Sequence, residues 1–558
     1  MTAAAVPGAR VVLSPEFIQA RDNPTITSAV PAGTDTSLSG AAGSSGGKVW
    51  SSMQQAIFGW VEAAADGSSS AAARHLVIEA LAGSGKSTTI VEALRYVYDD
   101  QPACFLAFNK EIVTSLRPKV PAGVKVATCH SYSNRALTAA FGSQEPNRWA
   151  AADRVTALMG RSWDTKALRG AVTQLVSRAK GSLVDEPAGL DALADSAGID
   201  LPDHPAWSRD RCIATAARVL RETREQAGSR PWDFDDMIWL PLVLDLPLEA
   251  QDWIFVDETQ DLNPAQLEMI QRIAGDNGRI VAVGDRHQSI YGFRGADRGA
   301  IPRMIAELAA DVLPLSVSYR CPAAVVREAQ ALVPELQAAP GAKDGIVRSA
   351  AAEELQRQAG PGDFVISRTN APLVQLCFQW LAAGKRATIR GRDLAGGLAT
   401  WVRNTKAQDI PTLQRCLREW EAKECARLEA ADRPADHVLD KSACLEALMQ
   451  GAGSPADVVG RIDQLFDGPE HDRVVLTSTH RAKGLEADRC WLLRDTYMQT
   501  RSHYRSRASG KRLARSARIT DWDAVERVDQ APDQEEKNLF YVAITRSKNE
   551  LIYVHGGS

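Results

Sequence analysis

The peptide LAGSGKST at residues 81–88 constrains the fold of this chain more than any other feature. An apolar, strand-like run at residues 75–80 precedes it and a helical pattern follows it. A glycine-rich turn between a strand and a helix directs backbone N–H groups and the helix N-terminus at a phosphate group. The peptide therefore predicts a phosphate-binding loop (P-loop), and a glycine-rich turn without a ligand is the alternative.

Each position of the P-loop has an expected task. Lys86 is expected to reach the β- and γ-phosphates, and Ser87 to hold Mg²⁺ through its hydroxyl. The other positions expected to contact the nucleotide are Ala82, Gly83, Ser84, Gly85 and Thr88.

A second segment supplies carboxylates. Residues 254–258 read IFVDE, an apolar strand that ends in two acidic side chains. We expect Asp257 to hold Mg²⁺ and Glu258 to act as the base beside the attacking water. Taken alone, either carboxylate could be a solvated strand end or a helix cap.

The apolar runs of the chain predict an α/β fold. Short apolar runs alternate with helix-length segments in two series, which indicates two α/β domains with parallel sheets, each carrying a helical insertion. The first series is 75–80, 103–107, 124–128, 253–256 and 280–283; the second is 345–347, 363–367, 386–390, 473–477, 488–493 and 551–555. We expect a flexible arm at residues 1–48. The first α/β domain is expected at 49–130 and 233–312, with a helical insertion at 131–232. The second is expected at 313–394 and 470–558, with a short helical insertion at 395–469.

The composition narrows the class of protein. The 558 residues include 65 basic and 69 acidic side chains, a net charge of −4, so the overall charge does not favour a protein that coats a polyanion. Nine cysteines, none in a CxxC pair, argue against a disulfide scaffold or a zinc site and favour a reducing cytoplasm. We find neither an apolar run of about eighteen residues nor a secretory signal pattern, so no membrane association is expected.

Read in order, the motifs resemble superfamily 1 DNA helicases of the UvrD/Rep type, in particular the compact phage-type and F-box DNA helicase branch. The resemblance covers about residues 53–554. It rests on MQQAIF, LAGSGKST, FLAFNKEI, ATCHSYS, DFDDMIWLP, FVDETQD, VGDRHQSIYGFRGAD, LSVSYRCP, ISRTNAP, LTSTHRAKGLEAD and EEKNLFYVAITRSKNEL. It implies two RecA-like domains with ATP and Mg²⁺ between them.

The resemblance also implies roles around the nucleotide. Gln54 would read adenine, with Gln55 as the second choice, and Tyr319 would stack on the base. Glu486 would contact the ribose side, and Gln288 would couple the γ-phosphate to the DNA-binding elements. Arg320 and Arg546, which spacing alone would leave as surface charges, would be arginine fingers from the second domain.

A single-strand track needs aromatic platforms and polar groups for the backbone. Tyr291 and Phe293 are the expected platforms, and Phe108 and Asn109 follow a strand of the first domain; core packing is the alternative for the aromatic residues. Further contacts to phosphates or bases are expected from His130, Ser131, Arg294, Arg368, Asn370 and His480.

Several positions depart from the family pattern. Ser87 stands where threonine is usual, Thr88 replaces an arginine, and Ser478-Thr479-His480 replaces Thr-Leu-His. The second insertion is short, which argues against regulation by a swivelling accessory domain. Residues 494–518 hold eight basic residues and one acidic residue, with Tyr497 and Tyr504 among them, and are either a solvated loop or a contact to the DNA backbone.

The resulting hypothesis is an ATP-dependent DNA helicase or translocase that moves 3′→5′ on single strands and unwinds duplex in repair, recombination or replication. The alternative is a nucleotide-gated DNA-binding or signalling subunit without unwinding activity. A P-loop kinase or GTPase would not need QSIYGFRGA or THRAKGLE. The expected partners are single-stranded and tailed duplex DNA and repair or replication proteins. The chain is expected to be a monomer in the bacterial or phage-infected cytoplasm, associated with the nucleoid.

Overall fold

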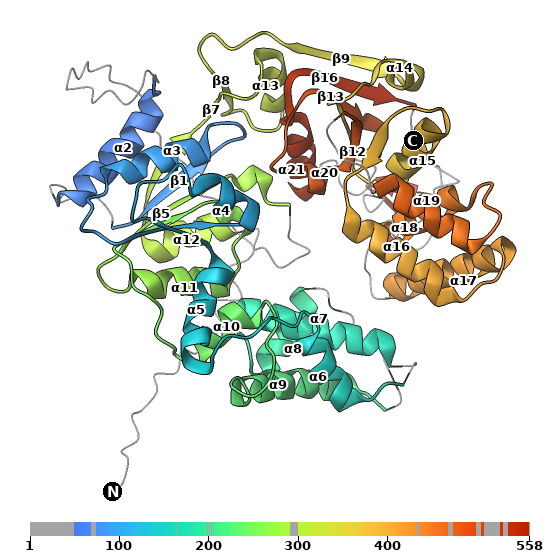
Figure 1. The fold of residues 1–558 in the computed structure, drawn as a ribbon, viewed down its shortest axis with the longest axis horizontal. Coiled ribbons are helices and arrows are strands. Elements are labelled where there is room, and N and C mark those ends of the chain that lie inside the picture. The colour runs from blue at the N-terminus through green and yellow to red at the C-terminus, as the bar shows by residue number, and fades with distance from the viewer. Residues whose placement is uncertain are drawn as a thin grey trace, which may run out of the picture. The chain divides into compact units, whose positions relative to one another are not determined.

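Two parallel β-sheets of six strands each organise the chain in this computed structural model. All helices and strands described below belong to the unit Ser51–Ser558 (Figure 1). The expected flexible arm and the expected short element at 11–20 lie outside the described residues. The structure describes residues 49–67, 74–162, 165–197, 199, 201, 204, 206–290, 299–430, 435–466, 472–497, 504–506, 525–527 and 534–556.

The first sheet has the strand order β3-β2-β4-β5-β1-β6, with every neighbouring pair parallel. Five of its strands were expected, because their continuous apolar runs are typical of strands buried on both faces. The sixth, β6, was not expected, since it lies at the sheet edge, is half exposed and contains Pro314. The strands are β1 (Leu76–Ala80), β2 (Ala103–Ala107), β3 (Lys125–Thr128), β4 (Trp253–Val256), β5 (Arg279–Gly284) and β6 (Asp311–Leu315).

Helices cover this sheet and a further helical group is inserted between β3 and β4. The sheet carries α2 (Ser52–Ala65), α3 (Lys86–Ala93), η1 (Leu94–Tyr96), α4 (Lys110–Leu116), η2 (Thr259–Asp261), α11 (Pro264–Ala274), η3 (Arg286–Gln288) and α12 (Ala300–Leu308). The inserted helices are α5 (Cys129–Phe141), α6 (Ala150–Met159), α7 (Lys166–Ser182), α8 (Pro187–Ser196), α9 (Arg209–Glu225) and α10 (Asp236–Val243). Helices α6 to α9, teal to green in Figure 1, pack against one another around a core that includes Val172, Leu175 and Val219.

The second sheet has the order β11-β12-β10-β13-β16-β9 and is also parallel throughout. Its strands match the second series of apolar runs. They are β9 (Ile346–Ala351), β10 (Phe364–Ser367), β11 (Ala387–Ile389), β12 (Val474–Ser478), β13 (Ala487–Leu493) and β16 (Ser547–His555). The two sheets confirm the expected α/β fold, with two RecA-like domains.

Short strand pairs and helices complete the second domain. The pairs are β7 (Val317–Ser318) with β8 (Gln337–Ala338) and β14 (Tyr504–Ser506) with β15 (Val525–Arg527). The helices are α13 (Ala323–Gln330), α14 (Ala352–Gln358), α15 (Ala371–Ala382), α16 (Arg392–Thr405), α17 (Ile410–Ala430), α18 (Asp436–Met449), α19 (Pro455–Phe466), α20 (Thr479–Ala482), η5 (Arg494–Thr496) and α21 (Gln534–Ile544).

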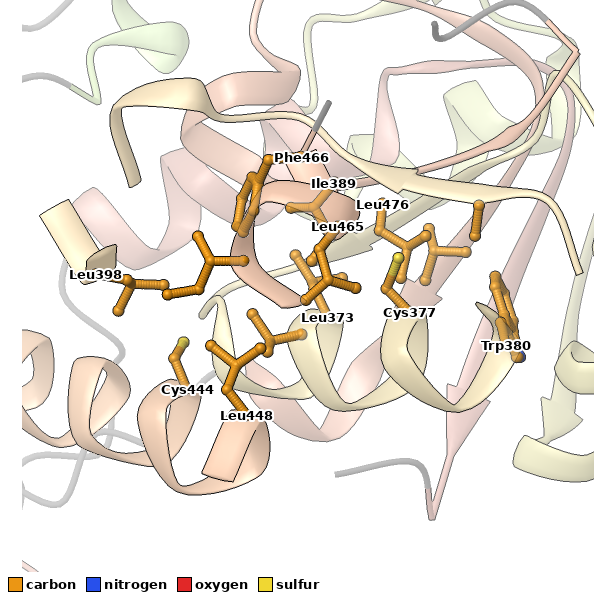
Figure 2. Close-up of a cluster of buried hydrophobic side chains, with 14 of the residues drawn as sticks. Leu373, Cys377, Trp380, Ile389, Leu398, Cys444, Leu448, Leu465, Phe466 and Leu476 are labelled. Carbon is orange, nitrogen blue, oxygen red and sulfur yellow. The ribbon is translucent and has the colours of Figure 1, made fainter. Parts of the chain in front are cut away.

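The inserted helices α16 to α19 share their main core with the second sheet. Figure 2 shows Leu398 of α16, Leu448 of α18 and Leu465 of α19 in one cluster with Ile389 of β11 and Leu476 of β12. The insertion is therefore packed onto the sheet as part of the same hydrophobic core. None of the helices among the described residues is long and apolar enough to cross a membrane.

Candidate functional site

The P-loop connects β1 to α3 through two glycines with left-handed backbone. Gly83 has φ of +72° and Gly85 has φ of +81°. A Cβ atom on Gly83 would lie only 2.6 Å from Arg320 Cβ and from Ser318 Oγ. Backbone conformation and close approach therefore both require glycine at position 83. The N–H of Tyr319 donates to the carbonyl of Gly83 over 2.9 Å, so the segment around Arg320 is bonded directly to the P-loop.

The two expected Mg²⁺ ligands lie side by side. Ser87 Oγ donates to Asp257 Oδ2 over 2.9 Å. Burial, followed by the charge of Glu258, raises the pKa of Asp257 to about 6, and Lys86 works in the opposite direction. A hydroxyl beside a carboxylate is an oxygen donor set suited to Mg²⁺. Among the described residues, no group of three or more His, Cys, Asp or Glu side chains could hold a metal ion, so phosphate oxygens and water would complete the coordination.

The expected base, Glu258, is held in an unusual backbone conformation. Its φ is +55°, in the left-handed region, which a non-glycine residue adopts at an energetic cost. Gln260 Nε2 donates to the Glu258 carboxylate and fixes its orientation. Burial raises the pKa of Glu258, but the positive charges of Lys86 and Lys483 outweigh burial, and the pKa lies below its ordinary value. Glu258 is thus ionised and oriented, as a general base requires.

Gln54 and Tyr319 adjoin the P-loop from two different segments. Gln54 is buried, and its Nε2 donates to Thr89 Oγ1 over 2.9 Å. Tyr319, which is 49% exposed, has its hydroxyl 3.4 Å from Gln54 Oε1. A Cβ on Gly85 would lie 3.7 Å from Gln54 Nε2, so both side chains border the nucleotide loop. Gln55 is exposed on α2, which favours Gln54 as the adenine reader.

The two expected arginine fingers already have partners within the protein. Arg320 Nε donates to Glu486 Oε2 over 2.6 Å, which joins two residues expected to touch the nucleotide. Arg546 is 1% exposed and donates to the carbonyls of Val542 and Leu485. Burial, together with the charge of Arg320, lowers the pKa of Arg546 to about 10. A guanidinium carries five N–H donors, so Arg320 could donate to a phosphate while its Nε keeps Glu486, whereas Arg546 already donates through all three of its nitrogens.

Gln288 is buried at the end of η3. Its Nε2 donates to Asp285 Oδ2 over 2.7 Å. The backbone N–H of Asp285 donates to Gln260 Oε1 over 3.0 Å, and Gln260 in turn donates to Glu258. Gln288 is therefore connected to the expected base through a continuous series of hydrogen bonds.

Two expected DNA contacts in the first domain have local structural tasks. Asn109 Oδ1 accepts from the N–H of Ile112 over 2.9 Å and caps α4. Ser131 forms a capping box with Thr128 at the start of α5. Phe108 precedes Asn109 and is 43% exposed, so its ring is accessible for stacking. Asn109 and Ser131 can also be explained by helix capping alone.

The expected DNA contacts in the second domain lie in intramolecular networks. Arg368 forms a bidentate pair with the buried carboxylate of Glu536 at 2.7–3.1 Å. Asn370 Nδ2 donates to Asp440 Oδ2 over 2.8 Å and its Oδ1 accepts from Arg481.

The remaining expected DNA contacts that the structure describes are two half-buried histidines. Burial lowers the pKa of His130, and His480 is also half buried. Tyr291, Phe293 and Arg294 lie outside the described residues, as does most of the basic segment 494–518.

Two family models match the chain. The model described as UvrD/REP helicase N-terminal domain matches residues 60–308, and the UvrD-like helicase C-terminal domain matches residues 461–555. The chain belongs to the UvrD/Rep helicase family. The first matched region includes β1 to β5 and the P-loop, and the second includes β12, β13 and β16, which confirms the expected family.

Relatives within the UvrD/Rep family match to different extents. The chain is 38% identical over 99 residues to DNA helicase II of Escherichia coli (strain K12), which covers 17% of this chain and 14% of that protein. It is 22% identical over 533 residues to F-box DNA helicase protein 1 of Schizosaccharomyces pombe, which covers 86% of this chain and 55% of that protein. It is 26% identical over 249 residues to a probable DNA helicase of Mycoplasma pneumoniae, which covers 39% of this chain and 45% of that protein. The chain thus spans about half or less of the length of these relatives.

Sequence reasoning missed several site residues that this UvrD/Rep-type chain brings to the nucleotide loops. Tyr541 of α21 accepts a hydrogen bond from the N–H of Ala82 over 3.0 Å through its hydroxyl. Lys483 reaches Asp261 from the second domain. Tyr541 lies in the motif EEKNLFYVAITRSKNEL and Lys483 in LTSTHRAKGLEAD, both quoted above for the family resemblance. Neither contact could be predicted from motif spacing, because each joins residues more than 200 positions apart.

Proposed function

We propose that the chain is an ATP-dependent DNA translocase and helicase that moves 3′→5′ along single-stranded DNA and separates duplex. The observation that carries the proposal is the arrangement at the P-loop. Ser87 and Asp257 lie 2.9 Å apart in the first domain, and Gly83 is bonded to the segment that carries Arg320. A triphosphate at this loop would contact groups attached to both domains.

The residues divide the chemistry of hydrolysis among them. Phosphoryl transfer needs little more than positioning and charge neutralisation. Lys86 would bind the β- and γ-phosphates, and Glu258 would accept a proton from the attacking water. Mg²⁺, held by Ser87 and Asp257, would neutralise charge on the phosphates. Arg320 and Arg546 would stabilise the charge that develops on the transferred group.

Movement along DNA would follow from domain closure. If ATP draws the two domains together and hydrolysis releases them, the strand advances only when each domain's grip on DNA alternates with the nucleotide state. Phe108 is an accessible aromatic ring in the first domain, and the second domain would contribute residues near Arg368, Asn370 and His480. Because Arg368 is paired with Glu536, it would contact the strand only after that pair rearranges.

Strand displacement on tailed duplexes tests the proposal. Wild-type protein with Mg²⁺ and ATP should displace the strand from a 3′-tailed duplex, and Lys86→Ala should not. Displacement from 5′-tailed duplex alone would contradict the direction. Single-strand-stimulated ATP hydrolysis without displacement would favour the alternative, a nucleotide-gated DNA-binding subunit. A role in repair, recombination or replication in the cytoplasm, as a monomer, is part of this proposal.

A further inference from the structure

The loop that follows β10 is bonded to a carboxylate of the second helical insertion. Asp440 lies in α18, and its Oδ1 accepts from the backbone N–H groups of Asn370 and Ala371, each over 2.8 Å. Asp440 Oδ2 accepts from Asn370 Nδ2, also over 2.8 Å. This loop, residues 368–371, carries Arg368 and Asn370, both of which are expected to contact DNA. A residue of the inserted helices is therefore bonded directly to an expected part of the DNA track.

The first turn of α15 takes its cap from Asp440 rather than from its own sequence. Asn370 is the N-cap residue, but its side chain makes no capping hydrogen bond. Pro372 follows in the first turn and has no N–H to donate. The carboxylate of Asp440 accepts from two N–H groups at this end of the helix, where the helix dipole favours negative charge. Removing the carboxylate would leave both donors to water and would release the backbone at 370–371.

The sequence of α18 explains how Asp440 reaches this point. Asp440, Cys444 and Leu448 are spaced four residues apart, so they lie on one face of the helix. Figure 2 shows Cys444 and Leu448 in one hydrophobic cluster with Leu373 of α15. The apolar part of this face packs against α15, and the polar residue that continues it meets the N-terminus of the same helix.

Asn370 extends the connection to a second loop. Its Oδ1 accepts from Arg481 Nη1 over 3.3 Å. Arg481 lies in α20, directly after His480, another expected DNA contact. The guanidinium of Arg481 packs over Gly391 at the start of α16, where an added Cβ would lie 2.8 Å from Arg481 Nε. Asp440 and Gly391 thus support, from two helices of the insertion, the loops that follow β10 and β12.

We propose that Asp440 is a positioning residue for the DNA-binding loop 368–371, so that the inserted helices help to set the grip of the second domain on the strand. The inference rests on the proposed function and adds a residue outside all the motifs that carry the family resemblance. Asp440 does not itself bind the strand, since a carboxylate repels phosphate. It acts by fixing the direction of the Asn370 amide and of the backbone beside it.

The test is binding of a fluorescein-labelled oligothymidylate to the full chain, measured by fluorescence anisotropy. Asp440→Ala should weaken binding by about tenfold, the equivalent of one or two hydrogen bonds between loop and strand. The sign of the change is informative, because removing a negative charge near a polyanion would by itself tighten binding. The DNA concentration that gives half-maximal stimulation of ATP hydrolysis should rise by the same factor, while kcat at saturating DNA changes by less than about twofold.

A second cap in the same insertion provides the matched control. Asp409 Oδ1 accepts from the N–H of Thr412 over 2.7 Å in the first turn of α17. Asp409→Ala should lower the thermal unfolding temperature about as much as Asp440→Ala does, because each removes a helix cap, but it should leave DNA binding unchanged.

A milder variant keeps the inference testable if Asp440→Ala does not fold. Asp440→Asn retains an oxygen for the two backbone N–H groups but turns an amide donor toward Asn370 Nδ2. It should therefore weaken DNA binding by a smaller factor, about threefold.

A double-mutant cycle tests the route through Asn370. If Asp440 acts through this side chain, Asn370→Ala and the double variant Asn370→Ala/Asp440→Ala should bind the oligothymidylate within about twofold of each other. Losses that add would contradict that route. Unchanged or tighter DNA binding by Asp440→Ala would overturn the inference while leaving the proposed function intact. A wild-type chain that does not bind single-stranded DNA would overturn the proposed function and this inference with it.

Discussion

Ser87 Oγ and Asp257 Oδ2 lie 2.9 Å apart, although the two residues are separated by 170 positions in the chain. The hydrogen bond joins the start of α3 to the end of β4 and brings a hydroxyl to a carboxylate whose pKa is raised to about 6, mainly by burial. A buried carboxylate with a raised pKa lowers the stability of the ligand-free protein and is suited to binding a cation.

Replacing Asp257 should separate stability from ligand binding. Asp257→Asn should raise the thermal unfolding temperature of the ligand-free protein near neutral pH. The pKa of Asp257 is higher in the folded protein than in the unfolded chain. Ionisation of Asp257 therefore lowers the unfolding free energy of the protein as pH rises between about 4 and 6. The gain should therefore disappear at about pH 4. The measurement is thermal unfolding with and without Mg²⁺ and ATP, and an equal stabilisation of variant and wild type by ligand would contradict the Mg²⁺ role.

Gly83→Ala should abolish nucleotide binding at the P-loop. The new Cβ would require an unfavourable φ and would meet Arg320 Cβ and Ser318 Oγ at 2.6 Å. Gly59→Ala is the matched control, because nothing lies within 4 Å of its Cβ position in α2, and it should stabilise the protein by about 0.5–1 kcal/mol. Equilibrium binding of an ATP analogue and denaturant unfolding check both expectations. Full nucleotide binding by Gly83→Ala would show that the loop can shift away from Arg320.

Tyr319→Ala should raise KM for ATP by roughly tenfold, in keeping with about 1–3 kcal/mol for stacking of a base on an aromatic ring. Tyr319→Phe keeps the ring and removes only the long contact of its hydroxyl, 3.4 Å from Gln54 Oε1, so its KM should stay within about twofold. Steady-state kinetics with ATP are sufficient. Equal KM values for the two variants would mean that the ring does not stack on the base.

Lys180→Met should destabilise the inserted helices of the first domain. Lys180 is 1% exposed and pairs with Asp233 at 2.7 Å and Asp236 at 2.8 Å. Its removal leaves Asp233 without its cation and leaves Asp236 with only the longer contact to Arg154 at 3.8 Å, which should cost about 3–5 kcal/mol of unfolding free energy. Burial already raises the pKa of Asp236 to about 6, so protonation relieves the unpaired charge at acidic pH.

The loss in Lys180→Met should accordingly be smaller at about pH 5 than at about pH 8. Denaturant unfolding at the two pH values measures it. Lys423→Met, at an exposed position of α17, should have little effect at either pH. An equal loss at both pH values would argue that the effect comes from packing rather than charge.

The strands were the most predictable part of the fold. The expected runs 103–107 and 253–256 coincide with β2 and β4, because buried parallel strands are continuous apolar runs bounded by polar residues. The edge strand β6 lacks that signal, since all its residues except Leu315 are at least partly exposed and one is proline. Hydrophobic patterning alone cannot distinguish such an edge from a loop.

The residues expected to contact the nucleotide were predictable where they lie in one short motif. They were not predictable where the fold brings distant segments together. Lys86 and Ser87 follow from one short motif, whereas the bond between Lys483 and Asp261 joins positions 222 residues apart and needs the arrangement of two domains. Asn109 and Ser131 show a different limit. Asn109 lies three residues before Ile112, and Ser131 lies three residues after Thr128; both spacings are typical of helix caps. The same side chain can therefore be explained either as a DNA contact or as a cap.

The core shared between α16–α19 and the second sheet has a mechanical consequence (Figure 2). The helices pack Leu398, Leu448 and Leu465 against Ile389 of β11 and Leu476 of β12. Removing these helices would therefore expose apolar side chains of both strands to water. Since close-packed interiors transmit displacement with little compression, a push on the outer face of the insertion would be carried directly to the strands behind Arg368 and His480. A load on the insertion would then act on the second sheet itself.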